Sequence, residues 1–252
     1  ENPVGEVTKE MLASLEITYE RQQTVMGYLS MVEQLGIDIV DIIPNAVGYK
    51  RSLLSKLETE ERVAVVDIGA NTSTVTIFSA GKIQSSETFN IGVKIVTEAL
   101  MEKLGLSFTV AEDFKITHGN CLTKETTDEI VLEQRQADGS ITYITSKFVA
   151  QIIEEKYLEI IRVIKRYLID TGEKNKINKY VLIGGGVAID NFEKLFRNNF
   201  GVNAAVRSPN SVGTRHPKYS AIVSGQYNIL YYEKLFEEKH EMVAFKNKYK
   251  TI

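Results

Sequence analysis

The spacing of apolar positions changes near residue 63 from a pattern that includes a helix to one typical of consecutive strands. Residues 63–90 hold three short apolar or alternating segments divided by turn residues, a pattern that predicts three strands. Upstream, residues 21–36 place apolar side chains at helical spacing and end at a glycine, which predicts an amphipathic helix between two strands in the part up to residue 57. Residues 55–62 are polar and charged. We expect a hinge there and place a domain boundary between residues 57 and 58.

Helical and strand patterns alternate through the rest of the chain. Residues 93–104 and 110–117 predict helices, and residues 126–145 predict two strands around an Asp-Gly turn. Residues 146–171 carry apolar side chains every three or four positions, as a long amphipathic helix does. Residues 180–196 form an apolar strand, three glycines and a helical segment. The sequence therefore predicts a mixed α/β fold.

The amino-acid composition excludes some classes of function but does not indicate a particular one. Of the 252 residues, 43% are hydrophobic and 25% are charged, and the net charge of −3 offers no overall field for nucleic acid. The single cysteine, Cys121, excludes an internal disulfide, and the three histidines do not have the spacing of metal ligands. No apolar run approaches the roughly 18–20 residues of a membrane span. We expect a folded domain that does not bind nucleic acid.

The hairpin of residues 63–78 contains a candidate phosphate-binding turn. Its first strand ends near the carboxylate of Asp67, and the turn that follows is Gly69-Ala70-Asn71-Thr72-Ser73. Backbone N–H groups of such a turn can point at anionic oxygens, and the two hydroxyls add donors. The carboxylate is placed to hold water around a divalent cation, which suits a nucleotide triphosphate. An ordinary hairpin with Asp67 as a turn residue has the same pattern.

Two further motifs allow a ligand or a purely structural interpretation. Gly184-Gly185-Gly186 lets the backbone approach a flat ligand closely, or simply makes a tight turn from strand to helix. Glu112 and Lys115 share one face of a helix, where they can hydrogen-bond the hydroxyls and ring edge of a nucleoside. Alternatively, Thr109 is an N-cap and Glu112 completes its capping box.

Taken in order, the motifs resemble those of the FtsA family, the bacterial actin homologues of cell division. The resemblance extends over nearly the whole chain. Its segments are residues 2–5, 34–46, the hairpin at Asp67, Asn90-Ile91-Gly92, Ala111-Glu112 to Lys115 with His118-Gly119, residues 153–160, the triple glycine, residues 207–209 and residues 217–225.

The resemblance implies an α/β, actin-like (ribonuclease H-like) lobe with part of a small inserted α+β subdomain. Residues 1–57 correspond to the remainder of that subdomain and the first connecting helix. Residues 58–230 correspond to the second lobe, which includes a subdomain at about 93–160 that binds the FtsZ tail, and residues 231–252 form a C-terminal extension. The implied cofactors are ATP and Mg²⁺, with Asp67 holding the metal through water. The implied ligand residues are Asp67, Gly69, Ala70, Asn71, Thr72, Ser73, Glu112, Lys115, Gly184, Gly185, Gly186 and Val187.

The implied partners are the FtsZ C-terminal tail, further copies of the protein in a head-to-tail filament, and the membrane through a C-terminal helix. This implies a cytoplasmic protein, peripheral on the inner face of the cell membrane at the division site. Lys156, where the family usually has arginine, is the expected contact for the acidic tail, although a solvated helix charge explains it as well. Residues 231–252 are basic and aromatic, but we favour an extension of the last domain helix over a membrane helix.

The sequence also departs from the family pattern. The family's first Asp-Ile-Gly hairpin has no counterpart before Asp67, so we expect the chain to be part of a longer protein and to bind nucleotide weakly or not at all by itself. Where actin-like ATPases have a Gln or Glu that orients water, this chain has the apolar Ile43, with only Asn45 polar nearby. We therefore expect slow or absent hydrolysis and a structural role for ATP.

Two alternatives remain. The motif Asp67-Ile68-Gly69-Ala70 matches PilM, a relative in type IV pilus assembly, as well as it matches FtsA. His118-Gly119 and residues 2–5 favour FtsA. A sugar kinase or Hsp70-type ATPase would need a carboxylate base and a complete first lobe, and the sequence indicates neither.

Overall fold

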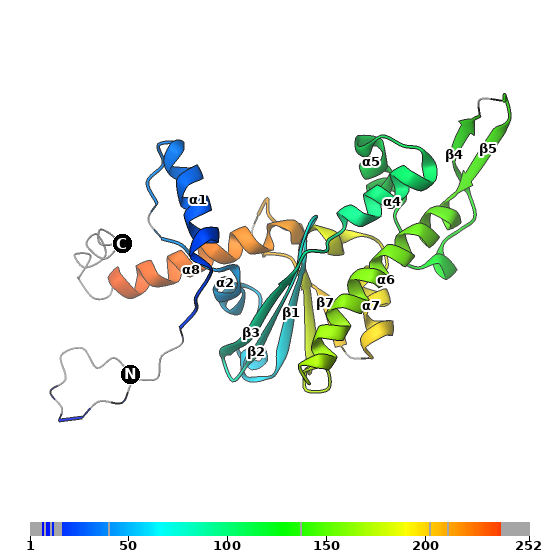
Figure 1. Ribbon diagram of the computed structural model, residues 1–252. Coiled ribbons are helices and arrows are strands. Elements are labelled where there is room, and N and C mark those ends of the chain that lie inside the picture. The colour runs from blue at the N-terminus through cyan, green and yellow to red at the C-terminus, as the bar shows by residue number, and fades with distance from the viewer. Residues whose placement is uncertain are drawn as a thin grey trace. The chain divides into compact units, whose positions relative to one another are not determined.

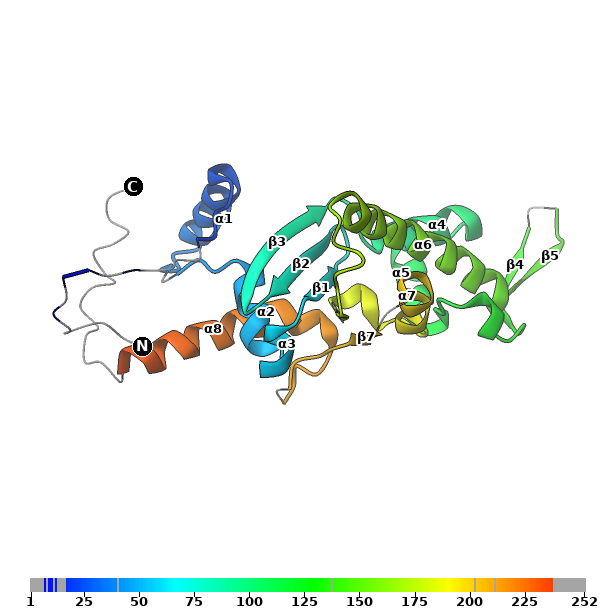
Figure 2. The same ribbon diagram turned by 90° about the horizontal axis from the view of Figure 1, so that it is seen from below.

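The computed structural model describes most of the chain (Figures 1 and 2). The described residues are 7, 9–10, 12, 17–39, 41–136, 138–201, 203–210 and 212–237, the last six without their side chains. Internal contacts divide the chain into two units, residues 1–44 and residues 45–252. The division falls before the boundary expected after residue 57.

In the first unit, helix α1 (Gln22–Gln34) is confirmed. Gly36 follows it with φ at +68°, the left-handed conformation that glycine adopts without strain. The first predicted strand lies mainly outside the described residues. The second is wrong, because residues 37–39 and 41–44 have no regular structure. Their alternation of apolar and polar side chains has no partner strand in the described part of this unit.

The expected hinge at residues 55–62 is also wrong. After α2 (Asn45–Ser52), the segment forms helix α3 (Lys56–Glu60). The Ser55 hydroxyl accepts a hydrogen bond from the Glu58 backbone, and the Glu58 carboxylate accepts one from the Ser55 backbone. This capping box satisfies backbone donors at the start of the helix. The polar residues that indicated a hinge are therefore the caps of a short, packed helix.

The three strands predicted for residues 63–90 are confirmed and belong to a five-stranded sheet. Its order is β3-β2-β1-β6-β7, in which β1 pairs antiparallel with β2 and parallel with β6. The strands are β1 (Val63–Ile68), β2 (Ser73–Ser79), β3 (Lys82–Phe89), β6 (Lys179–Ile183) and β7 (Asn203–Val206).

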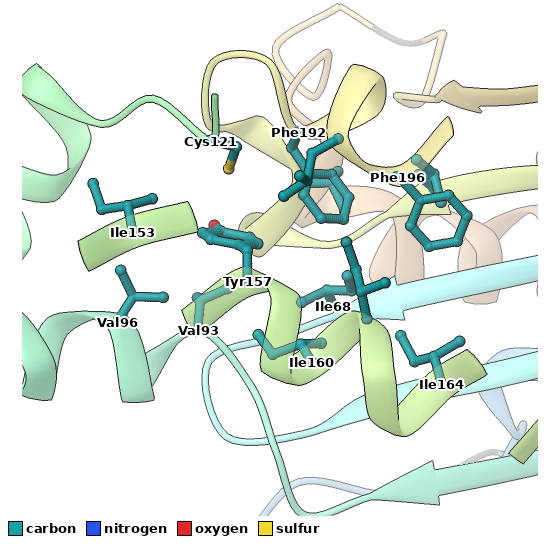
Figure 3. Packing of buried hydrophobic residues seen from close by; sticks show 14 of the residues in the cluster. Ile68, Val93, Val96, Cys121, Ile153, Tyr157, Ile160, Ile164, Phe192 and Phe196 are labelled. Carbon is teal, nitrogen blue, oxygen red and sulfur yellow. The ribbon is translucent and has the colours of Figure 1, made fainter. Parts of the chain in front are cut away.

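Both faces of the sheet are covered, which explains the nearly continuous apolar run of β1. Ala64, Val66 and Ile68 face one core, and Val63 and Val65 face the other. The first and larger core contains residues from α4, α6 and α7, and Figure 3 shows part of it, with Ile68, Tyr157 and Phe192 among the labelled side chains. The second core contains Tyr49 of α2.

The predicted elements between the sheet strands are confirmed, with small shifts of their ends. They are α4 (Lys94–Leu104), α5 (Phe108–His118), β4 (Ile130–Arg135), β5 (Ile141–Thr145) and α6 (Ser146–Asp170). The short helix η1 (Thr123–Glu125) was not predicted. The β4–β5 hairpin lies beyond the N-terminal end of α6, away from the five-stranded sheet, in both ribbon views (Figures 1 and 2). The long helix thus connects this outer part to the sheet.

The remaining elements follow β6 in the sequence. They are η2 (Gly185–Ala188), α7 (Phe192–Phe200), η3 (Pro217–Tyr219) and α8 (Ser220–Glu237). Helix α8 packs against α2, and an oxygen of Ser52 lies 2.5 Å from one of Ser224. Residues 238–252, which include most of the predicted C-terminal extension, lie outside the described part. Within that part, no helix combines the length and the apolar composition needed to cross a membrane.

Candidate nucleotide-binding site

Parallel pairing of β1 and β6 brings the two glycine-bearing turns together. Asp67 lies opposite Ile183 in the register, so both strands end at the same edge of the sheet. A Cβ added to Gly184 would lie 2.4 Å from Oδ1 of Asp67, and the φ of Gly184 is +94°. No side chain other than hydrogen fits at this position without displacing the carboxylate. The two motifs, more than a hundred residues apart in sequence, are thus adjacent in space.

Backbone hydrogen bonds hold the turn after Asp67. The Gly69 N–H donates to the Thr72 carbonyl over 2.9 Å, and the N–H groups of Val93 and Lys94 donate to the Gly69 and Ala70 carbonyls over 3.0 and 2.8 Å. The start of α4 is therefore attached to this turn. A Cβ on Gly92 would lie 2.5 Å from both carbonyl oxygens, which explains the glycine before α4.

The predicted ligand residues of this turn differ in their exposure to solvent. Ala70, Asn71 and Thr72 are exposed, whereas Ser73 is buried. The Ser73 hydroxyl already donates to the carbonyl of Ile91 over 2.8 Å. Ala70, Asn71 and Thr72 are therefore the residues of the turn that an anion could approach, whereas Ser73 fixes the turn to the chain before α4.

Asp67 carries a partly buried carboxylate without a cationic partner among the described residues. Its Oδ2 accepts a hydrogen bond from the Tyr49 hydroxyl over 2.8 Å. Burial raises the pKa of Asp67, and the bond from Tyr49 opposes this only in part. The same burial, together with the adjacent carboxylate, raises the pKa of Tyr49. The hydroxyl therefore stays protonated and available as a donor.

The three glycines have different environments. A Cβ on Gly186 would lie 2.6 Å from the Val93 side chain and 2.8 Å from that of Ile68, and the Gly186 carbonyl accepts a hydrogen bond from Tyr157 over 2.7 Å. Gly185 is exposed, and a Cβ there would meet only Lys218 at 3.6 Å. The outer glycines thus allow the close packing of a tight turn, and the middle one faces solvent, so its role toward a ligand stays a prediction.

Glu112 and Lys115 contact each other. Lys115 Nζ lies 2.8 Å from a carboxylate oxygen of Glu112 and 2.9 Å from the hydroxyl of Thr97 on α4. The Lys115 side chain is 8% exposed and that of Glu112 is 37% exposed. Burial alone would raise the pKa of Glu112, but the hydrogen bonds from Lys115 and Thr97 outweigh it and lower that pKa. Glu112 is thus the more accessible of the two to a ligand.

The capping alternative for Glu112 is wrong. Helix α5 begins at Phe108 with Ser107 as its N-cap, so Thr109 lies inside the helix, and Ser107 makes no side-chain capping bond. The carboxylate of Glu112 points toward α4 and accepts a hydrogen bond from Thr97 over 2.5 Å. This tertiary contact, which the local sequence could not indicate, replaces the cap.

Lys156 is paired within its own helix. Its Nζ lies 2.7 Å from a carboxylate oxygen of Glu159, and that hydrogen bond, with Glu155 and Glu102 nearby, raises the pKa of Lys156. Its side chain is 27% exposed. An acidic peptide at this position would therefore have to compete with Glu159.

The sequence did not indicate two residues near the glycine turns. Tyr49 contacts Asp67 from α2, and Lys218 on η3 lies beside Gly185. The Gly184 N–H also donates to the Pro217 carbonyl over 3.2 Å, which ties η3 to the triple glycine. No local pattern indicates that the hydroxyl of Tyr49 meets a carboxylate 18 residues away.

The donors at this edge fit an oxygen-bound divalent cation better than a fully protein-ligated metal. Among the described residues no group of three or more His, Cys, Asp or Glu could hold a metal. Asp67 is a single, partly buried carboxylate, and Mg²⁺ commonly takes one or two carboxylates, several waters and phosphate oxygens. A cavity of about 480 Å³ lies beyond η2, and of the predicted ligand residues only Val187 lines it.

Comparison with solved structures defines the class of protein. MreB5 of Spiroplasma citri bound to AMPPNP matches with a TM-score of 0.68 and 16% identity, over 87% of this chain and 68% of that one. PilM in a PilM–PilN type IV pilus biogenesis complex matches with a TM-score of 0.61 and 19% identity, over 81% of this chain and 57% of that one. With a mixed sheet and two adjoining turns, the chain has the actin fold.

Sequence comparison then gives the family. The model of the family "Cell division protein FtsA" matches residues 64–224, more than half of the chain, and the chain belongs to the FtsA family. FtsA of Bacillus subtilis is 29% identical over 198 residues, 76% of this chain and 44% of its own length. FtsA of Staphylococcus epidermidis is 22% identical over 222 residues, 86% of this chain and 47% of its own length. The chain thus spans about half the length of the curated relatives it matches.

Proposed function

We propose that the protein binds ATP with Mg²⁺ at the edge formed by the Asp67 turn and the triple glycine. The observation that supports this most is the parallel register of β1 and β6, which brings a partly buried carboxylate, a turn of exposed residues and a glycine turn to one place. Backbone donors in a turn suit phosphate oxygens, and the carboxylate suits the waters of a hydrated cation. Glu112 and Lys115 would contact the nucleoside.

A binding measurement on the intact gene product that contains this chain tests the nucleotide site. We expect a fluorescent ATP analogue to bind in the presence of Mg²⁺, and Asp67→Asn to weaken binding by at least tenfold, because the neutral amide attracts the hydrated cation less. Asp138→Asn is the matched control, since Asp138 is an exposed carboxylate in the β4–β5 turn. Equal affinity for wild type and Asp67→Asn would contradict the proposed site.

We further propose that the protein tethers FtsZ filaments to the inner face of the membrane and forms actin-like filaments. Membership of the FtsA family supports the link to cell division. The tail-binding site would lie on the part formed by α4, α5, the β4–β5 hairpin and the start of α6, with Lys156 as its cation. An acidic tail would then replace Glu159 as the partner of Lys156.

Fluorescence anisotropy with labelled peptides separates this function from that of a PilM-like protein. We expect the FtsZ C-terminal peptide to bind and a PilN N-terminal peptide not to bind. Lys156→Glu should reverse the local charge and weaken binding of the FtsZ peptide by about tenfold or more. Arg166→Glu is the control, because Arg166 is an exposed cation on the same helix but near its C-terminal end, outside the proposed binding part. Preference for the PilN peptide would favour the pilus alternative.

We expect ATP to act mainly as a structural ligand. The residue at the expected water-orienting position, Ile43, is apolar, and Asn45 is the only polar residue in the segment 42–46. Bound ATP would then favour one arrangement of the two lobes of the whole protein and so promote filament formation. A turnover number of the intact gene product above about 1 per second, within the usual range of enzymes, would contradict this.

A further inference from the structure

Tyr49 joins helix α2 to the carboxylate of Asp67. The side chain is 1% exposed, and its hydroxyl donates to Oδ2 over 2.8 Å. Asn45, one helical turn earlier, acts to lower the pKa of Tyr49, but burial outweighs this effect and keeps that pKa raised. The phenol has one proton, and Tyr49 donates it to the carboxylate of Asp67.

The other oxygen of the carboxylate is confined from the opposite side. A Cβ at Gly184 would lie 2.4 Å from Oδ1, which means that the glycine backbone lies directly against this oxygen. Tyr49 thus fixes one oxygen by a hydrogen bond, and the triple-glycine turn limits the space around the other. The carboxylate cannot rotate freely about its last torsion angle while both neighbours are in place.

Helix α2 is itself held firmly, so that it can fix Tyr49. The ring packs in the second core with Val63, Val65 and Phe78, all of which are buried. On the other side of α2, Gly48 meets the backbone of Ser224 so closely that a Cβ would lie 2.6 Å from it. Close packing of this kind determines the position of a side chain to within fractions of an ångström.

We propose that Tyr49 is a positioning residue, which sets the orientation of the Asp67 carboxylate for the waters of a bound divalent cation. This role rests on the proposed nucleotide site. A carboxylate held in one orientation loses no further freedom when the hydrated cation binds, whereas an unrestrained one must be ordered at that moment. A hydrogen bond to a metal-binding group typically affects metal affinity by about 10- to 100-fold.

Tyr49→Phe in the intact gene product tests the role, because it removes the hydroxyl and keeps the ring. Tyr180→Phe is the matched control, since Tyr180 is also buried and its hydroxyl has no hydrogen-bond partner in the described part of the chain. ATP-analogue binding is measured by anisotropy at increasing Mg²⁺ and in EDTA. Mn²⁺, which suits the same oxygen ligands, reports cation binding directly by electron paramagnetic resonance.

We expect Tyr49→Phe to raise the half-saturating Mg²⁺ and Mn²⁺ concentrations by about tenfold. Affinity for the analogue in EDTA should change by less than about twofold, because the hydroxyl acts on the cation and not on the nucleotide. Tyr180→Phe should alter neither. A general packing defect would instead lower both affinities or appear equally in the control.

The outcomes distinguish this inference from the proposed function. If the wild type binds the analogue with Mg²⁺ and Tyr49→Phe has the same cation dependence, the positioning role is overturned and the nucleotide site stands. Equal shifts for Tyr49→Phe and Tyr180→Phe overturn it as well. If the wild type binds no analogue at any Mg²⁺ concentration, the proposed site is overturned and the role of Tyr49 with it.

Discussion

Arg207 and Glu58 form a two-point ion pair between the end of β7 and helix α3. One guanidinium nitrogen lies 2.8 Å from a carboxylate oxygen of Glu58, and a second nitrogen contacts the other oxygen. Lys179 contacts the same carboxylate over 2.6 Å. Glu58 is 8% exposed. A short helix with little apolar surface is thereby fixed to the sheet by charge-assisted hydrogen bonds.

Glu58→Gln should destabilise the protein by about 3 kcal/mol at pH 7, because it leaves Arg207 and Lys179 without their anionic partner. Urea unfolding of the wild type and the variant measures this difference. Glu60→Gln is the control. Glu60 lies on the same helix, is exposed and forms no ion pair among the described residues. A loss below about 1 kcal/mol, as for a surface pair, would contradict the buried arrangement.

The destabilisation should also depend on pH. Hydrogen bonds from Arg207 hold the pKa of Glu58 well below its usual range in the folded protein. The group therefore contributes stability above its unfolded pKa of about 4.3, and this contribution decreases as the pH falls below that value toward the folded pKa. The difference between wild type and Glu58→Gln should accordingly shrink between about pH 5 and pH 3. A difference that is constant over this range would show that the charge of Glu58 is not responsible.

The sequence predicted those parts of the fold that local pattern determines. The long helix α6, the hairpin of β1 and β2 and the β4–β5 hairpin follow from periodicity and turn residues. The hinge was wrong for a physical reason. Glu58 is polar, but it is buried because Arg207, 149 residues away, neutralises it. No local pattern contains that information.

The motifs of the candidate site could be predicted from the sequence, but the tertiary contacts between them could not. The turn after Asp67 and the triple glycine could be found because both depend on small residues next to apolar strands. Their adjacency depends on the register of β1 and β6, and Tyr49 depends on how α2 packs against the sheet. Likewise, the spacing of Glu112 and Lys115 indicated a shared face, but the contact with Thr97 depends on the packing of α4 against α5.

Gly184→Ala should lower both stability and nucleotide affinity. A methyl group there collides with Oδ1 of Asp67 and the carbonyl of Ile68, and the φ of +94° is unfavourable for alanine. Strain of this type costs about 1–3 kcal/mol. Gly185→Ala is the control for stability alone, because its Cβ would meet only Lys218 at an ordinary 3.6 Å. We expect a change below about 0.5 kcal/mol for the control in urea unfolding. Equal effects of the two variants would contradict the close approach of Gly184.

Removing the charge of Glu112 and removing the charge of Lys115 should lower the stability of the protein by different amounts. Glu112→Gln leaves a nearly buried ammonium uncompensated, whereas Lys115→Met leaves a half-exposed carboxylate that water can reach. We expect Glu112→Gln to be the more destabilising of the two. A double-mutant cycle by urea unfolding should give a coupling energy of about 1–3 kcal/mol. Lys94 and Glu98 on α4 provide the comparison, since their exposed pair should couple by less than about 0.5 kcal/mol. Equal coupling of the two pairs would show that burial does not strengthen the first.

The crossing of α2 and α8 depends on a glycine at one position and tolerates alanine at another. A Cβ on Gly48 would lie 2.6 Å from the carbonyl carbon and oxygen of Ser224, and since these are backbone atoms, the helices would have to separate. We expect Gly48→Ala to destabilise the protein by about 1–3 kcal/mol through overpacking. Gly225→Ala, next along α8 from Ser224, meets nothing within 4 Å and should stabilise the helix by about 0.5–1 kcal/mol. Urea unfolding of the two variants should therefore show changes of opposite sign in the free energy of unfolding. Destabilisation by Gly225→Ala would mean that α2 and α8 lie closer together at that position as well.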